Sequence, residues 1–228
     1  MRVIPLVATL LHWSWCTASP TVDDAKYVAT DIRCKFEELQ SLLEEKNVHA
    51  LKQSCSGADH AVQLACSLLI YVGENKQDAT SFVSHLPHKR EQAEWLWRWD
   101  AILLRHVADK TQGLFPSGFA GRYIDEIALL VNSGEAALDG LLTLDGYADG
   151  VYAEYIADKL ILILKDQPEI VYNNWRNIRG HATSLQGALE LYPEDMPFVK
   201  RSFDRLCAQD RRAPKCKEIQ NLFPTQGQ

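Results

Sequence analysis

The sequence predicts an all-α protein. Its apolar residues recur at spacings of three and four along most of the 228 residues, which is the period of a helix with one buried face. Polar or glycine-containing breaks separate these stretches, and no alternating run of β-branched residues is bounded by a two-residue hairpin turn. Hydrophobic residues make up 46% of the chain, which is enough for a folded protein with a buried core.

The first half of the chain predicts a series of helices. The first begins at the capping-box pair Thr21 and Asp24, and its apolar stripe continues to about Lys46. The later segments end at a glycine or before a proline, residues that stop helices. The expected helical segments are 21–46, 49–55, 58–72, 78–86 and 88–109. The last of these is apolar on two sides, which predicts a central helix buried between its neighbours.

The second half predicts further helices after an irregular connector at 111–119, TQGLFPSGF. The expected helical segments are 119–131, 136–144, 149–164, 168–179, 183–192, 196–207 and 217–223. The run LILIL at 160–164 has the composition of a strand, but it continues a helical spacing that begins at Tyr152. We therefore expect helix there as well.

An internal repeat indicates how these helices are arranged. The segment from Tyr123 aligns with the segment from Tyr155 at an offset of 32 residues, and each holds an apolar helix, a polar turn and a shorter helix. Stacked antiparallel helix pairs of this period resemble the HEAT-type units of α-solenoids. An irregular helical bundle is the alternative, and either arrangement is expected to be stapled by disulfides.

The N-terminus has the layout of a secretory signal peptide. Arg2 gives a short basic start, an apolar run follows, and the small residues Cys16 and Ala18 predict cleavage after Ala18. Pro5 disfavours a buried helix, and the run is too short to span a bilayer. We therefore expect a signal peptide at 1–18 and an exported protein, periplasmic or extracellular, without a stable membrane span.

The mature chain is expected to form a single helical domain, residues 19–228, with a candidate seam at 111–118. Its formal net charge is −6, and acidic residues lie close to each of its short basic pairs. Because binding to phosphate backbones needs a clustered basic face, we do not expect a nucleic-acid partner.

Export makes disulfides expected, because oxidising compartments favour cysteine pairing. Cys207 and Cys216 are far from the other cysteines in sequence and are predicted to join the last two helices. Cys55 and Cys66 flank a short turn and are predicted to join two neighbouring helices. Cys34 lies opposite the apolar stripe of its helix, so it is either the odd thiol or an alternative partner for one of this second pair.

Two aspartates stand where a calcium loop would begin. Asp145 and Asp149 have the right separation, but Tyr147 and Ile156 occupy positions at which two further oxygen ligands are needed. We expect instead that Gly146 ends one helix and that the side chain of Asp149 caps the next.

No motif assembles a catalytic or metal site. Pro87 separates His85 from His88, and about five helical turns separate His88 from His106. No nucleotide-binding loop, nucleophile elbow or C-x₂-C pair occurs. The sequence thus predicts no catalytic residue, no metal and no cofactor.

Aromatic residues gather in two places. Trp95, Trp97 and Trp99 are spread over both faces of one helix, which favours packing in the core. The connector at 111–119 is the better candidate for an exposed contact with a partner, and a loop that packs its aromatic residues into the core is the alternative that stays open. The candidate contact residues there are Leu114, Phe115 and Phe119.

These observations lead to the hypothesis of an exported, non-enzymatic helical protein that serves as a protein–protein interaction or scaffold module. Two alternatives remain open: a helical enzyme that acts on a cell-envelope polymer, whose acidic residues converge only in the fold, and a small-molecule or lipid carrier with an apolar cavity.

The cysteine pairing yields the first testable prediction. If the four cysteines of the two predicted pairs are bonded and the signal peptide is removed, thiol titration of the denatured, unreduced protein should find one thiol per chain. Three thiols per chain would contradict two disulfides.

Overall fold

A computed structural model of the protein describes residues 35–58, 60–77, 79–106, 117–210 and 214–223. Every regular element in these ranges is a helix, so the predicted all-α class is confirmed. The described residues fall into two compact units divided after Gln77, and each is described here by itself. The single domain at 19–228 stays a prediction, as does the seam, most of which lies outside the described residues.

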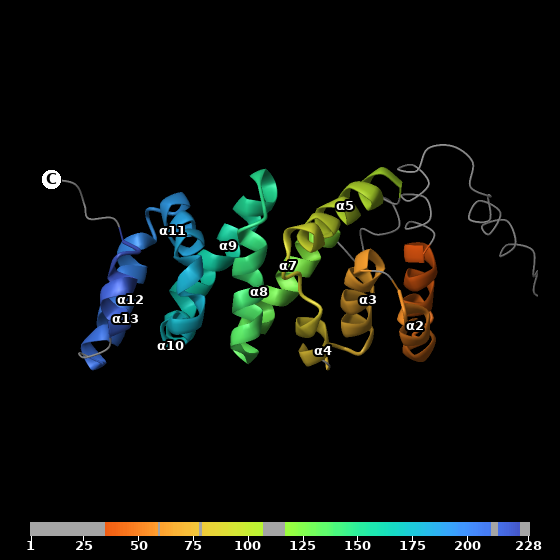
Figure 1. Ribbon diagram of the computed structural model, residues 1–228, viewed down its shortest axis with the longest axis horizontal. Helices are drawn as coiled ribbons and strands as arrows, with labels where there is room; N and C mark the ends of the chain where they lie inside the picture. Colours follow the sequence, from red (N-terminus) through yellow and green to blue (C-terminus); the bar gives the residue numbers. More distant parts are fainter. Residues whose placement is uncertain (1–34, 59, 78, 107–116, 211–213, 224–228) are drawn as a thin grey trace, which may run out of the picture. The chain divides into compact units, whose positions relative to one another are not determined.

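The described part of the first unit is helical, and Figure 1 shows it in orange tones. Its helical segments are residues 35–44, α2 (Val48–Cys55) and α3 (His60–Gly73). Lys46 ends the first segment in the left-handed conformation, with φ of 56°, and Asn47 caps α2 by accepting a hydrogen bond from the backbone N–H of Ala50. The core of this unit is aliphatic and aromatic. It includes Phe36, Leu39, Leu51, Leu64, Leu68 and Leu69.

The second unit begins with a group of helices around a large aromatic core. They are α4 (Ala79–Ser84), α5 (Arg90–His106), α7 (Gly118–Leu130), the 3₁₀ turn η2 (Val131–Ser133) and α8 (Glu135–Asp145). Tyr123 of α7 packs edge-on against Phe82 of α4 at a centroid distance of 5.1 Å. Trp99 of α5 is completely buried and lies 5.7 Å from Phe119. Burial of several aromatic rings is a large hydrophobic gain and holds α4, α5 and α7 together.

The second unit continues with pairs of helices along the chain. They are α9 (Gly150–Asp166), α10 (Pro168–Ile178), the 3₁₀ turn η3 (Arg179–His181), α11 (Ala182–Leu191), α12 (Met196–Gln209) and α13 (Pro214–Gln220). Helix α9 contacts α7, α8, α11 and α12, while α10 contacts α12 and α13 (Figure 1). The run LILIL lies within α9, so the predicted helix is confirmed there. The last helix begins earlier than predicted because Pro214 suits the first turn of a helix.

The helices of the second unit keep the period seen in the sequence. Helices α7, α9 and α11 begin at Gly118, Gly150 and Ala182, which are spaced by the same 32 residues as the internal repeat. Each is followed by a second helix in the same order. The choice between a HEAT-like solenoid and an irregular bundle stays a prediction.

Gly140 is the point at which α8 comes closest to the segment that follows α4. A Cβ atom at Gly140 would lie 2.3 Å from Cδ1 of Leu86, which is itself buried. Gly140→Ala is therefore expected to lower the free energy of unfolding by about 1–3 kcal/mol, the usual cost of overpacking a core. Urea unfolding followed by circular dichroism measures the change.

Gly187→Ala in α11 is the matched control, because no atom lies within 4 Å of the Cβ that it would add. Alanine favours a helix interior over glycine, so this variant should gain about 0.5–1 kcal/mol. Stabilisation by both substitutions would show that Gly140 is not a close contact.

Candidate functional site

The structure pairs the cysteines that the sequence predicts. Cys55 of α2 is bonded to Cys66 of α3, with their Cα atoms 5.9 Å apart, and Cys207 of α12 is bonded to Cys216 of α13, with their Cα atoms 5.6 Å apart. Among the described residues no cysteine is left unbonded. Cys34, for which the sequence left two roles open, lies outside the described residues.

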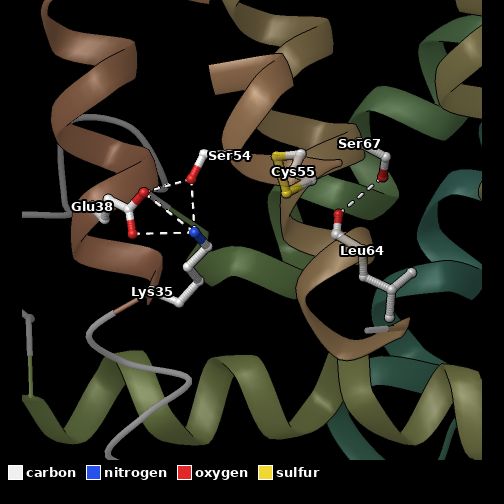
Figure 2. The surroundings of a disulfide bond; sticks show 7 residues. Lys35, Glu38, Ser54, Cys55, Leu64 and Ser67 are labelled. Atoms are coloured by element: carbon white, nitrogen blue, oxygen red, sulfur yellow. Dashed lines mark hydrogen bonds and ion pairs between the residues drawn. A yellow bond between two sulfur atoms is a disulfide. The ribbon is translucent and has the colours of Figure 1, made fainter. Parts of the chain in front are cut away.

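A polar cluster lies beside the first disulfide (Figure 2). Lys35 Nζ forms an ion pair with Glu38 at 3.1 Å and donates a hydrogen bond to Ser54 Oγ at 2.7 Å. Ser54 in turn donates a hydrogen bond to Glu38. Burial acts to raise the pKa of Glu38, but the hydrogen bonds from Ser54 and Lys35 outweigh it and leave the pKa lowered. The cluster links residues 35–44 to α2, next to the disulfide that links α2 to α3.

The second disulfide has an aromatic neighbour. The hydroxyl of Tyr172 in α10 donates a hydrogen bond to Asp210 at 3.3 Å and lies 3.5 Å from Cys216 Sγ. The ammonium of Lys215 lies 3.7 Å from the centre of the Tyr172 ring. Trp175 donates a hydrogen bond to Glu218 at 2.8 Å. These contacts hold α12 and α13 against α10.

The connector that the sequence favours as a contact loop is described only at its end. Leu114 and Phe115 lie outside the described residues. Phe119 is 1% exposed, in contact with the buried rings of Trp99 and Tyr123. For Phe119 the exposed contact is therefore wrong and the alternative of packing into the core holds, because the rings of Trp99 in α5 and Tyr123 in the next turn of α7 lie against it.

A buried carboxylate joins three helices of the second unit. Asp100 of α5 is 5% exposed and accepts hydrogen bonds from the backbone N–H of Ala120 at 2.9 Å and from the hydroxyl of Tyr152 in α9 at 3.0 Å. Gly118 has φ of +79°, and a Cβ atom there would lie 2.9 Å from the carboxylate. Asp100 thus caps the start of α7 from another helix and binds α9 as well. We refer to these residues as the Asp100 joint.

Burial controls the titration of the Asp100 joint. It raises the pKa of Asp100, against the opposing effect of the hydrogen bonds from Ala120, Tyr152 and Phe119. It also raises the pKa of Tyr152, and the neighbouring Asp100 carboxylate raises it further. Trp97 stacks on Tyr152 at a centroid distance of 4.4 Å, which shields the joint on one side. The sequence analysis missed this network. The feature of the sequence that could have indicated this network is an aspartate, Asp100, inside a tryptophan-rich helix that is apolar on two sides.

A second polar cluster joins α7 to α9. Asp125 accepts hydrogen bonds from Tyr155 at 2.8 Å and from Ser117 at 3.3 Å, and it pairs with Lys159 at 2.7 Å. Burial acts to lower the pKa of Lys159, but the hydrogen bond and charge of Asp125 outweigh it and raise the pKa. Lys159 is therefore a fixed positive charge that is already paired.

The two aspartates of the calcium-like segment act at helix ends. Gly146 is the C-cap of α8, as expected, and Asp149 is the N-cap of α9. The expected side-chain cap is wrong: the Asp149 side chain makes no capping hydrogen bond, and its backbone carbonyl accepts from Tyr152 and Ala153. In the described part of the chain, no three His, Cys, Asp or Glu side chains come together as metal ligands.

Three of the exposed large apolar side chains in the described residues lie on α9, α11 and α12. Leu162 is 49% exposed, Leu191 at the end of α11 is 54% exposed, and Phe198 in α12 is 46% exposed. Lys165 and Asp195 form an ion pair at 2.8 Å. Because Leu162 is one turn from Lys165 and Phe198 is one turn from Asp195, this pair brings the two apolar side chains to the same region. We call Leu162, Leu191 and Phe198 the apolar centre.

The charges around the apolar centre differ in sign from one helix to the next. On α9, Asp158 and Asp166 stand one turn before and one turn after Leu162. On α12, Arg201 and Arg205 follow Phe198 along the exposed side of the helix. The apolar centre therefore lies between an acidic helix and a basic one. The sequence analysis missed this surface, because exposure at one face of a helix depends on which neighbours pack against it.

Comparison of the chain with protein-family models, with curated proteins and with solved structures finds no match. In the described part of the chain, no helix is both long enough and apolar enough to cross a membrane.

The Asp100 joint yields a prediction about pH. Because burial raises the pKa of Asp100 above its ordinary value of 3.8, the folded state binds more protons there than the unfolded state. The stability contributed by Asp100 is then present below pH 3.8 and is lost as the pH rises through its pKa in the folded protein. The free energy of unfolding of the wild type minus that of Asp100→Asn should therefore fall as the pH rises from acid to neutral.

Glu38→Gln is the companion variant with the opposite sign. The pKa of Glu38 is lowered from 4.5, so its contribution is present above pH 4.5 and is lost as the pH falls. Urea unfolding at a series of pH values measures both differences. A difference for Asp100→Asn that does not change with pH would contradict a perturbed carboxylate.

Proposed function

We propose that the protein is an exported, non-enzymatic helical protein that binds another protein through its apolar centre. The observation that carries this proposal is that Leu162 and Phe198, each about half exposed, are one turn from the two partners of the Lys165–Asp195 ion pair, with the half-exposed Leu191 one helical turn's length before Asp195 in the sequence. Single exposed apolar residues are normal on a protein surface. Several together, with charged residues around them, are typical of an interaction site.

The apolar centre is small, so binding through it is expected to depend on the neighbouring charged residues as well. Complete burial of one large apolar side chain contributes about 1.5–3 kcal/mol. Since half of each side chain is already buried, the three together would contribute about 3 kcal/mol on binding. This is less than association costs in lost translational and rotational freedom. The neighbouring charges on α9 and α12 are therefore expected to supply part of the affinity and much of the specificity.

The helices under the apolar centre are well fixed. Lys165 and Asp195 tie the end of α9 to the start of α12, and the Cys207–Cys216 disulfide ties α12 to α13. A surface held in place before binding loses less conformational freedom when the partner binds. This supports a preformed docking surface.

Three buried or half-buried groups with shifted pKa values already have hydrogen-bond or ion-pair partners within the fold, which favours a function at the surface. Asp100 and Tyr152 bond to each other across helices, and Lys159 is paired with Asp125. These groups join helices and already have partners. We therefore place the function at the apolar centre.

Export is part of the proposal. Disulfides are typical of oxidising compartments, and the structure contains two between described residues. The signal peptide at 1–18 lies outside the described residues and stays a prediction.

Site-specific photo-crosslinking tests the proposed surface. A photoreactive phenylalanine analogue at Leu162 or at Phe198 should form a discrete crosslinked species in cells that express the full chain. The same analogue at Asn173, an exposed residue of α10, is the matched control and should form none. Equal crosslinking at Asn173, or no crosslink at either apolar position, would contradict the proposal.

A further inference from the structure

We infer that the partner of the apolar centre is a second copy of this chain, with α9 of each protomer packed against α12 of the other about a two-fold axis. The inference rests on the proposed function, since it names the partner of the same surface. It follows from the distribution of charge around the apolar centre.

The α9 side of this surface is acidic. Asp158 and Asp166 flank Leu162 at one turn on either side, and Glu154 continues the row by another turn. The two lysines of α9 are already paired with carboxylates of α7 and of the segment before α12, at 2.7 and 2.8 Å. Each lysine of α9 thus has a carboxylate of another segment as its ion-pair partner, and Lys165 is close to Asp166 as well.

More carboxylates gather where α9, α11 and α12 meet. Glu194 and Asp166 lie close enough to Lys165 to raise its pKa, together with its ion-pair partner Asp195. Glu190, next to Leu191, is exposed as well. The acidic residues thus extend from α9 across the end of α11 to Glu194 and Asp195, which immediately precede α12.

The α12 side of the surface is basic. Arg201 and Arg205 are exposed on the side of α12 that carries Phe198, and beyond the N-cap residue Asp195 the helix has one acid, Asp204. Phe198 lies one turn before Arg201, so an exposed aromatic ring and a guanidinium are neighbours. Arginine and aromatic residues are enriched in protein–protein interfaces, and arginine pairs well with carboxylates of a partner.

A surface with an apolar centre, one acidic side and one basic side is complementary to itself. A two-fold axis through the centre brings the acidic α9 of one protomer against the basic α12 of the other, and the same contact repeats in the other half. A partner with a surface of one sign would be attracted on one side of the centre and repelled on the other. A second copy of the chain satisfies both sides at once.

Sedimentation equilibrium of the oxidised protein tests the dimer. The wild type should be dimeric, and Leu162→Arg should raise the dimer dissociation constant by about tenfold or more, because it places a charge in the apolar centre. Val151→Arg is the matched control: Val151 is also on α9 and 77% exposed, but it lies about three turns from Leu162. It should leave the dissociation constant unchanged.

Charge exchange tests the arrangement itself. The double variant Asp158→Arg, Asp166→Arg and the double variant Arg201→Asp, Arg205→Asp should each be monomeric, since each places like charges together at both contacts. A mixture of the two should form a heterodimer, because every contact between them joins opposite charges. Circular dichroism of each variant alone checks that it is folded, and all of these substitutions are on exposed or half-exposed positions.

A monomeric wild type, or a dimer that survives Leu162→Arg or does not re-form on mixing, would overturn the inference. The proposed function fails separately. If the wild type is monomeric but Leu162 crosslinks to a different protein, the surface binds a partner that is not a second copy. If Leu162 crosslinks to nothing, both are overturned.

Discussion

The second unit depends on one carboxylate that is almost completely removed from water. Asp100 is in α5, yet its hydrogen bonds go to the first turn of α7 and to a tyrosine of α9. A buried charge is costly unless donors surround it, and the backbone N–H groups at the start of a helix are donors that otherwise lack partners. The carboxylate gains a donor and the start of α7 gains an acceptor, so the same contact satisfies both groups. Because Tyr152 of α9 donates to the same carboxylate, Asp100 holds the start of α9 as well as that of α7.

The second unit then continues by repetition. Helices begin at intervals of 32 residues at Gly118, Gly150 and Ala182, and each is followed by a second helix. The apolar centre takes one exposed residue from each of α9, α11 and α12 in this series.

The sequence predicted what depends on local chemistry. Helices follow from the spacing of apolar residues, and the two cysteine pairs follow from closeness along the chain, since Cys55–Cys66 and Cys207–Cys216 each span one turn between helices. It did not predict what depends on the packing of distant segments. Phe119 reads as part of a loop but is covered by Trp99. In the sequence, Leu162 is one of many apolar residues of its helix. Its exposure depends on which neighbouring helices pack against that face.

Each disulfide joins two cysteines that are close together in the sequence, and this closeness affects how readily the correct pairs form. The bonded cysteines are separated by 11 and 9 residues, so each thiol meets its partner frequently even in a disordered chain. The entropy lost on closing such small rings is modest, and the stabilisation that they give is correspondingly less than that of long crosslinks. In return, the correct pairs compete well against incorrect ones before any tertiary structure exists. The two segments can then be oxidised correctly one at a time, with little need for later reshuffling by an isomerase.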